Sequence, residues 1–320
     1  MTAPKSSQKT PPASPLLVLL VSVVGFSFAA PLIRLSSASP LVIATWRMGF
    51  SVVLVGIALL LSGTWRTWAT LARSDFLLAG AGGVMLALHF WSWNTSLVYT
   101  SVAASVSLVN LQPALVALVS VVWLGERPNG RQWSGIAIAI LGALVVGVAD
   151  VPGGISGIMR SLSGGGGGGS ADRALLGDFL AVVGAVAGTG YYLVGRRVRQ
   201  RLDLWPYVGL VYSAAFIILL LLAVGTGEKL LPQAPKDLAI FAGLALGPTL
   251  LGHTGLNWAL AYLPAFIVNL TVLGEPIGAT LLAAVIPGIG EIPGFGVVIG
   301  GALVLLGVIL TAKRKNDKPT

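Results

Sequence analysis

The chain has 320 residues, of which 55% are hydrophobic and only 10% are charged, whereas soluble domains carry about 25% charged residues. So few charges cannot cover a surface in water, which excludes a soluble protein and makes the lipid bilayer the solvent. The net charge of +9 therefore concerns the side of the membrane that the basic loops face, not nucleic-acid binding, and the absence of cysteine excludes disulfides, iron–sulfur clusters and thiolate zinc sites.

Ten continuous apolar runs follow one another, each close to the roughly 20 residues that a spanning helix needs. They lie at about 16–34, 41–61, 76–98, 101–123, 132–149, 174–195, 205–223, 238–258, 264–286 and 293–311. A β-barrel would show short alternating segments instead. Although Lys5 and Lys9 precede the first run as in a signal peptide, its length and the nine runs after it predict a retained helix. We expect an all-α polytopic membrane protein with ten transmembrane helices.

A glycine-rich segment separates five spans from five. Its run of glycines at 164–169 is typical of a flexible linker. The expected organisation is a disordered cytoplasmic N-terminus at 1–15, a first five-helix repeat at 16–149, an external linker at 150–173, a second five-helix repeat at 174–311 and a basic cytoplasmic tail at 312–320.

Lysines and arginines in the loops predict the orientation, because cytoplasmic loops carry more of them. With the N-terminus in the cytoplasm, the inside segments contain Lys5, Lys9, Arg66, Arg73, Arg127, Arg131, Arg196, Arg197, Arg199, Arg201, Lys313, Arg314, Lys315 and Lys318. The outside segments contain Arg34, Arg160, Arg173, Lys229 and Lys236. This excess predicts a multi-pass protein of the cell inner (plasma) membrane with both termini in the cytoplasm.

The two halves contain matching residues in the same order. At an offset of 163, Asn94, Tyr99 and Pro113 match Asn257, Tyr262 and Pro276; at an offset of 165, Glu126, Gly135 and Gly142 match Glu291, Gly300 and Gly307. Because each half has an odd number of spans, the second must cross the membrane upside down. Inverted repeats are typical of secondary transporters, with the substrate site near the midplane between the halves; the alternative is duplication in another kind of membrane protein.

The stretch from Pro113 through Leu124-Gly125-Glu126 to Gly142 resembles the repeat of the EamA-type drug/metabolite transporters, as do Gly25, Pro40 and Arg47 in the first two spans. The resemblance implies ten helices in inverted repeats, no nucleotide-driven motor and export of small metabolites. The aromatic-rich middle also resembles the YddG-type aromatic amino-acid exporters. One departure is that the second repeat reads Ile289-Gly290-Glu291 followed by Pro293, shifted by two residues.

Two polar residues lie near the centres of spans four and nine. Gln112 and Glu275 are 163 residues apart, and each directly precedes a proline. A polar residue inside a span is costly, so by default it faces the bundle interior. Since proline removes one backbone N–H, we expect the carbonyls of Val109 and Val272 to be free. The alternative is a kinked packing helix with a satisfied polar group.

Glu275 has a second possible use. A buried carboxyl group that gains and loses a proton would couple transport to protons as the driving ion. The alternative is a permanently hydrogen-bonded neutral acid.

Further candidates for substrate binding lie in the same central region. Besides Gln112 and Glu275 they are Trp46, His89, Trp93, Asn94, Asn110, Tyr212, His253, Asn257 and Trp258, with Tyr191 and Tyr192 as additional aromatic residues. Aromatic faces supply area for stacking on an aromatic substrate. The alternatives are packing histidines and tryptophans that face lipid. No third ligand with sensible spacing accompanies the two histidines, so we expect no metal.

Arg47 is a charge within the second span that has no basic counterpart in the other half, where Ser213 takes its place. It could hold a substrate carboxylate, lock an external gate against Glu291 or Asp150, or extend to the outer headgroups. A gate or structural role is favoured over direct binding, because Arg47 lies in the outer half of its span. Tyr99 and Tyr262 are the other candidates for gating or coupling.

The sequence contains no phosphate-binding G-x-x-x-x-G-K-[ST] motif and no catalytic constellation. We therefore expect no cofactor and no enzymatic activity, with a small molecule, an aromatic amino acid above all, and the lipid bilayer as partners. The predicted function is a secondary exporter of small amphipathic metabolites that alternates access to a midplane cavity. The alternatives are export of another metabolite or drug class, a channel, or an intramembrane enzyme.

Overall fold

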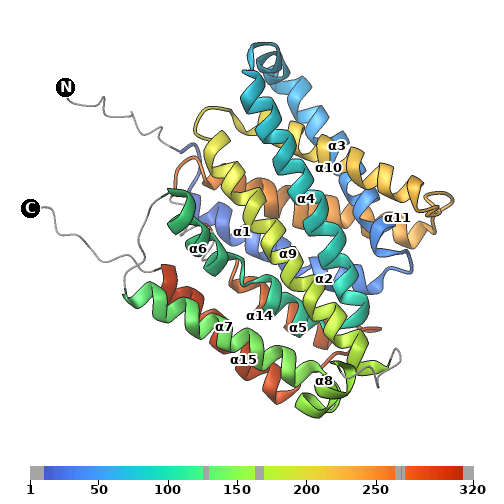
Figure 1. Ribbon diagram of the computed structural model, residues 1–320. Coiled ribbons are helices and arrows are strands. Elements are labelled where there is room, and N and C mark those ends of the chain that lie inside the picture. The colour runs from blue at the N-terminus through green and yellow to red at the C-terminus, as the bar shows by residue number, and fades with distance from the viewer. Residues whose placement is uncertain (1–10, 125–129, 163–168, 264–267, 269–270, 313–320) are drawn as a thin grey trace, which may run out of the picture.

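The computed structural model describes residues 11–124, 130–162, 169–263, 268 and 271–312. These residues form a bundle of helices, with no strand among them (Figure 1). Seven helices in this part of the chain are long and apolar enough to cross a membrane, and shorter apolar helices lie at Val102–Val116, Gly274–Val285 and Phe295–Gly307. The expected all-α polytopic membrane fold is confirmed.

In the first half, helices occupy all five expected spans. They are α1 (Pro15–Ser27) with α2 (Ala29–Leu35), then α3 (Pro40–Ser62), α4 (Arg73–Tyr99), α5 (Val102–Val109) with α6 (Gln112–Leu124), and α7 (Gly130–Asp150). A short 3₁₀-helix at Thr64–Thr70 connects α3 to α4. Span four is thus divided, and the division falls immediately before Gln112.

The second half repeats this pattern. Its elements are α9 (Ser170–Val198), α10 (Leu204–Gly225), α11 (Pro235–Leu244) continued by a π-helix, η2 (Ala245–Thr254), and α12 (Gly255–Ala259), then α14 (Gly274–Val285) and α15 (Phe295–Ala312). Only part of the ninth expected span, 264–286, lies within the described residues. The eighth span is irregular because Pro248 lies inside it and cannot donate a backbone hydrogen bond.

The segment expected to be a flexible linker contains a helix. Residues Gly154–Leu162 form α8, and α9 begins at Ser170, four residues earlier than expected. The helix is amphipathic: Ile155 and Met159 lie one turn apart, and both are exposed. The glycines at 164–168 lie outside the described residues.

Local signals explain where α3 begins and ends. The side chain of Ser39 accepts a hydrogen bond from the backbone N–H of Val42, and Pro40 occupies the first helical position, where its missing N–H costs nothing. Gly63 ends the helix in a left-handed conformation with φ of 66°, which glycine adopts without a steric penalty. These signals determine the bounds of α3, the helix that carries Arg47.

Glycines on α7 and α15 reveal the symmetry of the two halves. A Cβ atom on Gly142 would lie 2.7 Å from the carbonyl oxygen of Gly300, and one on Gly307 would lie 2.5 Å from that of Gly135. Since Gly135 matches Gly300 and Gly142 matches Gly307, each contact is the symmetry mate of the other. A two-fold relation produces such paired contacts, so the inverted repeat is visible in the packing of these two neighbouring helices (Figure 1).

A second pair of helix contacts, α4 with α9 and η2 with α1, follows the same symmetry at the level of whole helices. A Cβ on Gly184 of α9 would lie 3.3 Å from that of Trp93 on α4, and one on Gly252 of η2 would lie 2.9 Å from the ring of Phe26 on α1. The helices α4 and α9 run side by side across the centre of the bundle (Figure 1). Small residues allow this close approach in lipid, and they bring the aromatic residues of α4 and α1 to the middle.

Substituting Gly300 by valine should destabilise the protein. Its Cβ would lie 2.7 Å from the backbone nitrogen of Val146, so α7 and α15 would have to move apart; overpacking of this kind costs about 1–3 kcal/mol. The detergent-solubilised variant should lose its folded monodisperse peak at a lower temperature than wild type. Gly56→Ala on α3 is the control, since nothing lies within 4 Å of its added methyl group. Equal midpoints for Gly300→Val and wild type would contradict this packing.

Candidate functional site

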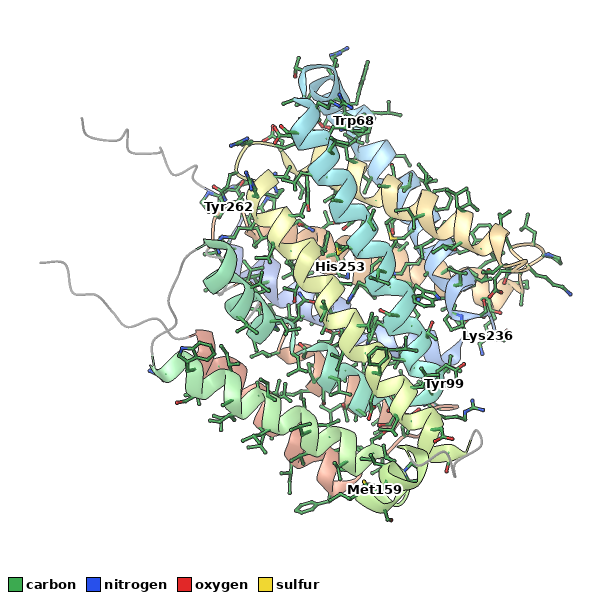
Figure 2. All side chains as sticks on the ribbon, viewed as in Figure 1. Trp68, Tyr99, Met159, Lys236, His253 and Tyr262 are labelled. Atoms are coloured by element: carbon green, nitrogen blue, oxygen red, sulfur yellow. The ribbon has the colours of Figure 1, made fainter. Side chains whose placement is uncertain are left out.

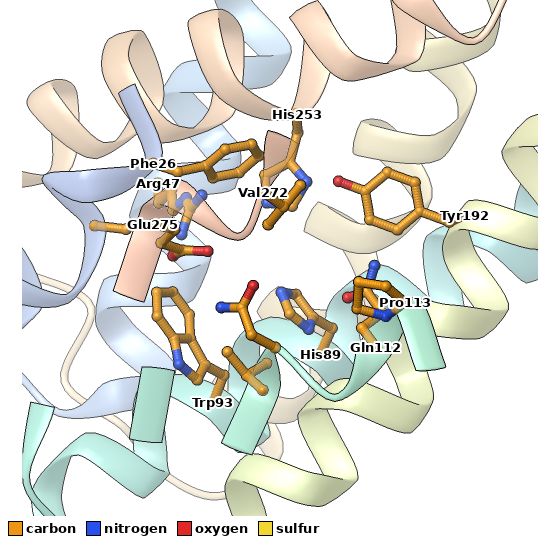
Figure 3. Close-up of a pocket in the computed structure, with 13 residues that line it drawn as sticks. Phe26, Arg47, His89, Trp93, Gln112, Pro113, Tyr192, His253, Val272 and Glu275 are labelled. Carbon is orange, nitrogen blue, oxygen red and sulfur yellow. The ribbon is translucent and has the colours of Figure 1, made fainter. Parts of the chain in front are cut away.

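A small cavity lies at the centre of the bundle, between the broken helices (Figure 3). Its lining residues are Phe26, Ala29, Arg47, His89, Trp93, Val109, Asn110, Gln112, Pro113, Tyr192, His253, Val272 and Glu275. The cavity volume is about 30 Å³, and one water needs about 10–15 Å³. In this conformation it holds about two waters, so a larger ligand requires the helices to separate.

The two helix breaks explain why polar side chains reach this cavity. Residues 110–111 separate α5 from α6, and non-helical residues 272–273 precede α14, so the breaks fall at matching positions of the two repeats. Val272 corrects one expectation: its carbonyl oxygen is not free but accepts a hydrogen bond of 2.8 Å from the N–H of Glu275. A tighter i→i+3 turn replaces the bond that Pro276 removes.

The amide of Gln112 depends on a glycine of α9. A Cβ on Gly188 would collide with Gln112 Oε1 and would lie 3.2 Å from His89 Nδ1. Thr189 Oγ1 lies 3.4 Å from the carbonyl oxygen of Gln112. The absence of a side chain at Gly188 therefore lets Gln112 and His89 occupy the same face of the cavity.

Arg47 supplies a positive charge to the cavity. It is fully buried, its Nε donates a 2.7 Å hydrogen bond to Thr249 Oγ1, and its guanidinium lies 4.0 Å from the centre of the Phe90 ring. Its Nη1 has no hydrogen-bond partner among the described residues. Thr249 lies in the π-helix, a distortion that often marks functional sites. The guanidinium is therefore fixed through Nε, and its Nη1 donor is left without a partner among the described residues.

Glu275 supplies a carboxyl group from the other half. It is buried, lies near Arg47 in the close-up view and contacts the Asn110 side chain (Figure 3). Asn110 Nδ2 donates to the carbonyl of Val106 at 2.8 Å, whereas its Oδ1 has no partner in the described part of the chain. A buried charge is tolerated when an opposite charge and hydrogen bonds surround it. Arg47 and Glu275 thus place a cationic group and an acidic group in the same cavity.

Aromatic and imidazole rings form the rest of the wall. The rings of His89 and His253 are 6.0 Å apart, His89 stacks on Trp93 at 6.1 Å, and Phe26 meets His253 edge-on at 4.8 Å. The Nδ1 of His89 lies 2.8 Å from the carbonyl oxygen of Gly184, which makes Nδ1 the donor and leaves Nε2 as an acceptor.

Seven of the expected binding residues line this cavity: His89, Trp93, Asn110, Gln112, Tyr192, His253 and Glu275. Two others on the outer half of the first repeat do not. Trp46 donates its indole N–H to the carbonyl of Leu230 at 3.1 Å, and Asn94 donates to the carbonyl of Pro40 at 3.3 Å. Both side chains instead hold neighbouring segments together.

The remaining four expected residues, Tyr191, Tyr212, Asn257 and Trp258, also pack elsewhere. The hydroxyl of Tyr212 lies 2.9 Å from that of Thr254, Asn257 Nδ2 donates to the hydroxyl of Tyr191 at 2.5 Å, and the ring of Trp258 lies 4.6 Å from that of Tyr262. Helical periodicity explains why Asn257 does not line this cavity. It shares a face with His253, but it lies one turn further along and reaches the α9 side of the bundle.

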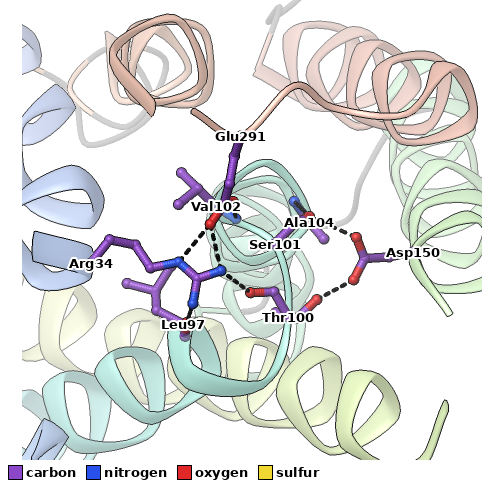
Figure 4. Close-up of polar contacts among 8 residues, drawn as sticks. All are labelled: Arg34, Leu97, Thr100, Ser101, Val102, Ala104, Asp150 and Glu291. Atoms are coloured by element: carbon purple, nitrogen blue, oxygen red, sulfur yellow. Dashed lines mark hydrogen bonds and ion pairs between the residues drawn. The ribbon is translucent and has the colours of Figure 1, made fainter. Parts of the chain in front are cut away.

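The expected pairing of Arg47 with Glu291 is not formed in this structure. Glu291 pairs with Arg34 instead, whose Nε donates to Glu291 Oε1 at 2.7 Å and whose guanidinium also bonds the carbonyls of Leu97 and Thr100 (Figure 4). The expectation failed because Arg47 lies two turns below the start of α3, whereas Arg34 ends α2 at the level of Glu291. The signal that could have identified Arg34 was its place at the end of the first span.

The two candidate gate tyrosines lie at opposite ends of the bundle, with His253 between them (Figure 2). Tyr99 lines a vestibule of about 470 Å³ at the end of the bundle that the sequence predicts to be the outer one, and the Arg173 guanidinium lies 5.3 Å from the centre of the Tyr99 ring. Tyr262 packs on Trp258 at the other end. The vestibule lies within the usual 300–1,000 Å³ range of ligand pockets, whereas the central cavity lies far below it.

Sequence reasoning missed Phe26 and Thr249. Phe26 was indistinguishable from the other apolar residues of its span, and only the neighbouring Gly25 hinted at a close contact: a Cβ there would lie 2.9 Å from the carbonyl of Gly247. Thr249 follows Pro248, and a proline within an apolar span was the available signal for the π-helix.

A membrane-spanning bundle of inverted repeats around a small polar cavity is the architecture of a secondary transporter. The model of the EamA-like transporter family matches residues 13–148 and 175–313. The chain therefore belongs to the EamA-like transporter family, and the expected resemblance is confirmed. The narrower similarity to aromatic amino-acid exporters stays a prediction.

Among the known proteins similar to this chain are two curated proteins and a solved crystal structure. A probable terminal-alkyne amino-acid exporter of Streptantibioticus cattleyicolor is 26% identical over 244 residues, which are 74% of this chain and 72% of that protein. The uncharacterized transporter YdfC of Bacillus subtilis is 22% identical over 211 residues, 65% and 62% of the two chains. A crystal structure with 19% identity superposes with a TM-score of 0.63 over 93% of this chain and 96% of the other, which shows a shared fold.

Proposed function

We propose that this transporter exports small amphipathic metabolites, aromatic amino acids first among them, by alternating access to the central cavity. It acts in the cell inner membrane with both termini in the cytoplasm, and its moving units are the five-helix repeats at 16–149 and 174–311, joined by the external segment at 150–173. The observation that carries this proposal is one buried cavity that contains Arg47, Glu275 and a set of aromatic rings.

The cavity matches an aromatic amino acid group by group. The unused Nη1 donor of Arg47 can bind the substrate carboxylate. Glu275 and the side-chain oxygen Oδ1 of Asn110 can accept hydrogen bonds from the substrate ammonium. The rings of Phe26, Trp93 and Tyr192 provide apolar area for an aromatic side chain. The printed name of the Streptantibioticus relative, a probable amino-acid exporter, supports the same substrate class.

Alternating access follows from the volumes of the two cavities. The central one holds about two waters, whereas the outer vestibule is about 470 Å³. A substrate that reaches the centre must therefore separate α5 and α14 from the helices around them, and rocking of one repeat against the other provides that motion. Arg34 and Glu291 close the path between the centre and the vestibule.

Glu275 couples export to protons in this proposal. Its carboxylate binds either the substrate ammonium or a proton, and the two compete for the same oxygen atoms. When it is protonated, the Asn110 Oδ1 atom, unpartnered among the described residues, can accept its hydrogen. The substrate then leaves outward, a proton moves inward in its place, and both bind at the same carboxyl group.

Transport in proteoliposomes should rank substrates by side chain. Phe, Tyr and Trp should be carried faster than Glu or Lys, because a second charge on the substrate would be buried without a partner at a cost of several kcal/mol. Uptake of radiolabelled Phe in competition with each unlabelled amino acid measures the order. Equal or better competition by Glu and Lys would remove the argument from the aromatic wall.

The same measurement separates the other candidate functions. Competition by unrelated apolar cations or drugs, with none by amino acids, would indicate a different export class within the family. Flux that neither saturates nor shows competition would indicate a channel. Chemical conversion of the labelled compound would indicate an intramembrane enzyme.

A further inference from the structure

Two carboxyl groups at the outer end of the bundle contact a single hydroxyl. Thr100 Oγ1 bonds Asp150 Oδ2 at the end of α7 and lies 2.8 Å from Asp178 Oδ1 on α9. Ser101 Oγ donates to the second oxygen of Asp150 at 2.6 Å (Figure 4 shows Thr100, Ser101 and Asp150). Neither aspartate lines the central cavity, so the pair is separate from Glu275.

The single hydroxyl hydrogen of Thr100 cannot form hydrogen bonds with two ionised carboxylates at once. A threonine hydroxyl carries one hydrogen and two lone pairs, so it can donate to one carboxylate only. Its contact with the second carboxyl is favourable only if that group carries a hydrogen and donates it to Thr100 Oγ1. One proton is therefore shared within the Asp150–Thr100–Asp178 chain.

The surroundings place this proton on Asp178. Asp150 is half-buried, lines the outer vestibule and accepts hydrogen bonds from two hydroxyls. Asp178 is only 7% exposed, and its Oδ2 has no partner among the described residues. A buried, unpaired carboxylate oxygen is costly, whereas a protonated Asp178 that donates to Thr100, with Thr100 donating to Asp150, satisfies the chain.

We propose that Asp178 and Asp150, bridged by Thr100, form an external proton-binding site. When a proton is bound there, the site holds the outer gate, which is the Arg34–Glu291 pair, closed. This inference rests on the proposed transport function and adds a second titrating site to it. The link to the gate is Thr100 itself, because its carbonyl accepts a 3.3 Å hydrogen bond from Arg34 Nη2 while its hydroxyl bonds both aspartates.

The charged groups around the pair are arranged for this role. Arg34 faces Thr100 from α2 and is itself paired with Glu291, and Arg173 on α9 lies over the Tyr99 ring. Loss of the proton leaves Asp150 and Asp178 to compete for one hydrogen and to repel each other. Thr100 then shifts, and Arg34 loses one of its acceptors. Protons reach Asp150 from the vestibule, so the external pH sets the occupancy.

The first test detects the proton directly and needs no transport. In a Glu275→Gln background, infrared difference spectra of the reconstituted protein should show a protonated carboxyl band that disappears as pH rises. Adding Asp178→Asn should abolish that band, and adding Asp75→Asn, at the exposed pair with Arg201, should leave it. A titrating band that survives Asp178→Asn, or the absence of any titrating carboxyl band in the Glu275→Gln background, would overturn the site.

The second test follows the gate. Because the chain has no cysteine, Ala283→Cys, a buried residue that lines the vestibule, is a unique label site. Its reaction with an impermeant maleimide should accelerate severalfold as external pH rises. The pH midpoint of this acceleration should equal the pH midpoint at which the infrared band disappears. Asp178→Asn, whose amide still donates to Thr100, should keep labelling slow at every pH. Thr100→Val should make labelling fast and pH-independent.

These outcomes are distinguishable from failure of the proposed function. A protein that transports no amino acid but shows both titrations has the proton site without that substrate. If the wild-type protein exchanges Phe normally but its Ala283→Cys label site reacts at a rate independent of pH, the external site is absent while the transport function stands.

Discussion

Replacing Glu275 by glutamine should abolish the stimulation of transport by a pH gradient while substrate-for-substrate exchange continues. Glutamine keeps the size of the side chain and one acceptor oxygen for the substrate ammonium, but it removes the titrating proton. Losing the charge of one hydrogen-bonded partner costs about 1.5 kcal/mol, so KM for exchange should rise about tenfold. Uptake of labelled Phe with and without an imposed gradient measures the first effect, and exchange at equal pH measures the second.

The control for this substitution is Glu228→Gln, at a partly exposed acid outside the central cavity whose carboxylate accepts a hydrogen bond from Ser39. It should keep both activities. If exchange and gradient stimulation weaken together in Glu275→Gln, the carboxylate only holds the ammonium and the coupling is elsewhere. Wild-type behaviour in both assays would mean that Glu275 is a packing residue.

Replacing Arg47 by glutamine should eliminate recognition of the substrate carboxylate. Arg47 is the buried positive charge of the cavity, and removing one partner of a buried ionic contact costs about 3–5 kcal/mol. The KM for Phe should therefore rise at least a hundredfold. Phenethylamine, which has the ring and the ammonium but no carboxylate, should inhibit the variant as well as it inhibits wild type, which assigns the loss to the carboxylate contact.

Arg201→Gln provides a matched control, since Arg201 is an exposed arginine that lies 3.7 Å from Asp75. Its transport should equal that of wild type. If Arg47→Gln weakened Phe and phenethylamine equally, Arg47 would support the cavity through Thr249 and Phe90 and would not touch the substrate.

The sequence predicted the architecture well because lipid imposes strong patterns. Ten apolar runs and a repeat offset of 163–165 residues gave the spans and their inverted order, and the packing of Gly142 on Gly300 agrees with that order. The positions of Gln112 and Glu275 before prolines predicted where helices four and nine break. Such features are local in sequence, so they can be identified without knowing the tertiary contacts.

The sequence predicted the site less completely because the rotation of each helix decides which residues face the cavity. Trp46 and Arg47 are adjacent, yet only Arg47 lines the cavity, since consecutive residues on a helix point about 100° apart. The π-helix shifts this rotation again at Thr249 and His253. Partners far apart in sequence, such as Arg34 and Glu291, follow only from the packed arrangement of the repeats.

Counterflow tests the central claim most directly. Proteoliposomes that contain the purified protein and a high concentration of unlabelled Phe should transiently accumulate external labelled Phe above its outside concentration, since a carrier returns with whichever substrate is bound. Arg47→Gln in the same lipid should not accumulate it at that concentration. Equilibration of the label without any overshoot in wild type would contradict alternating access to the central cavity.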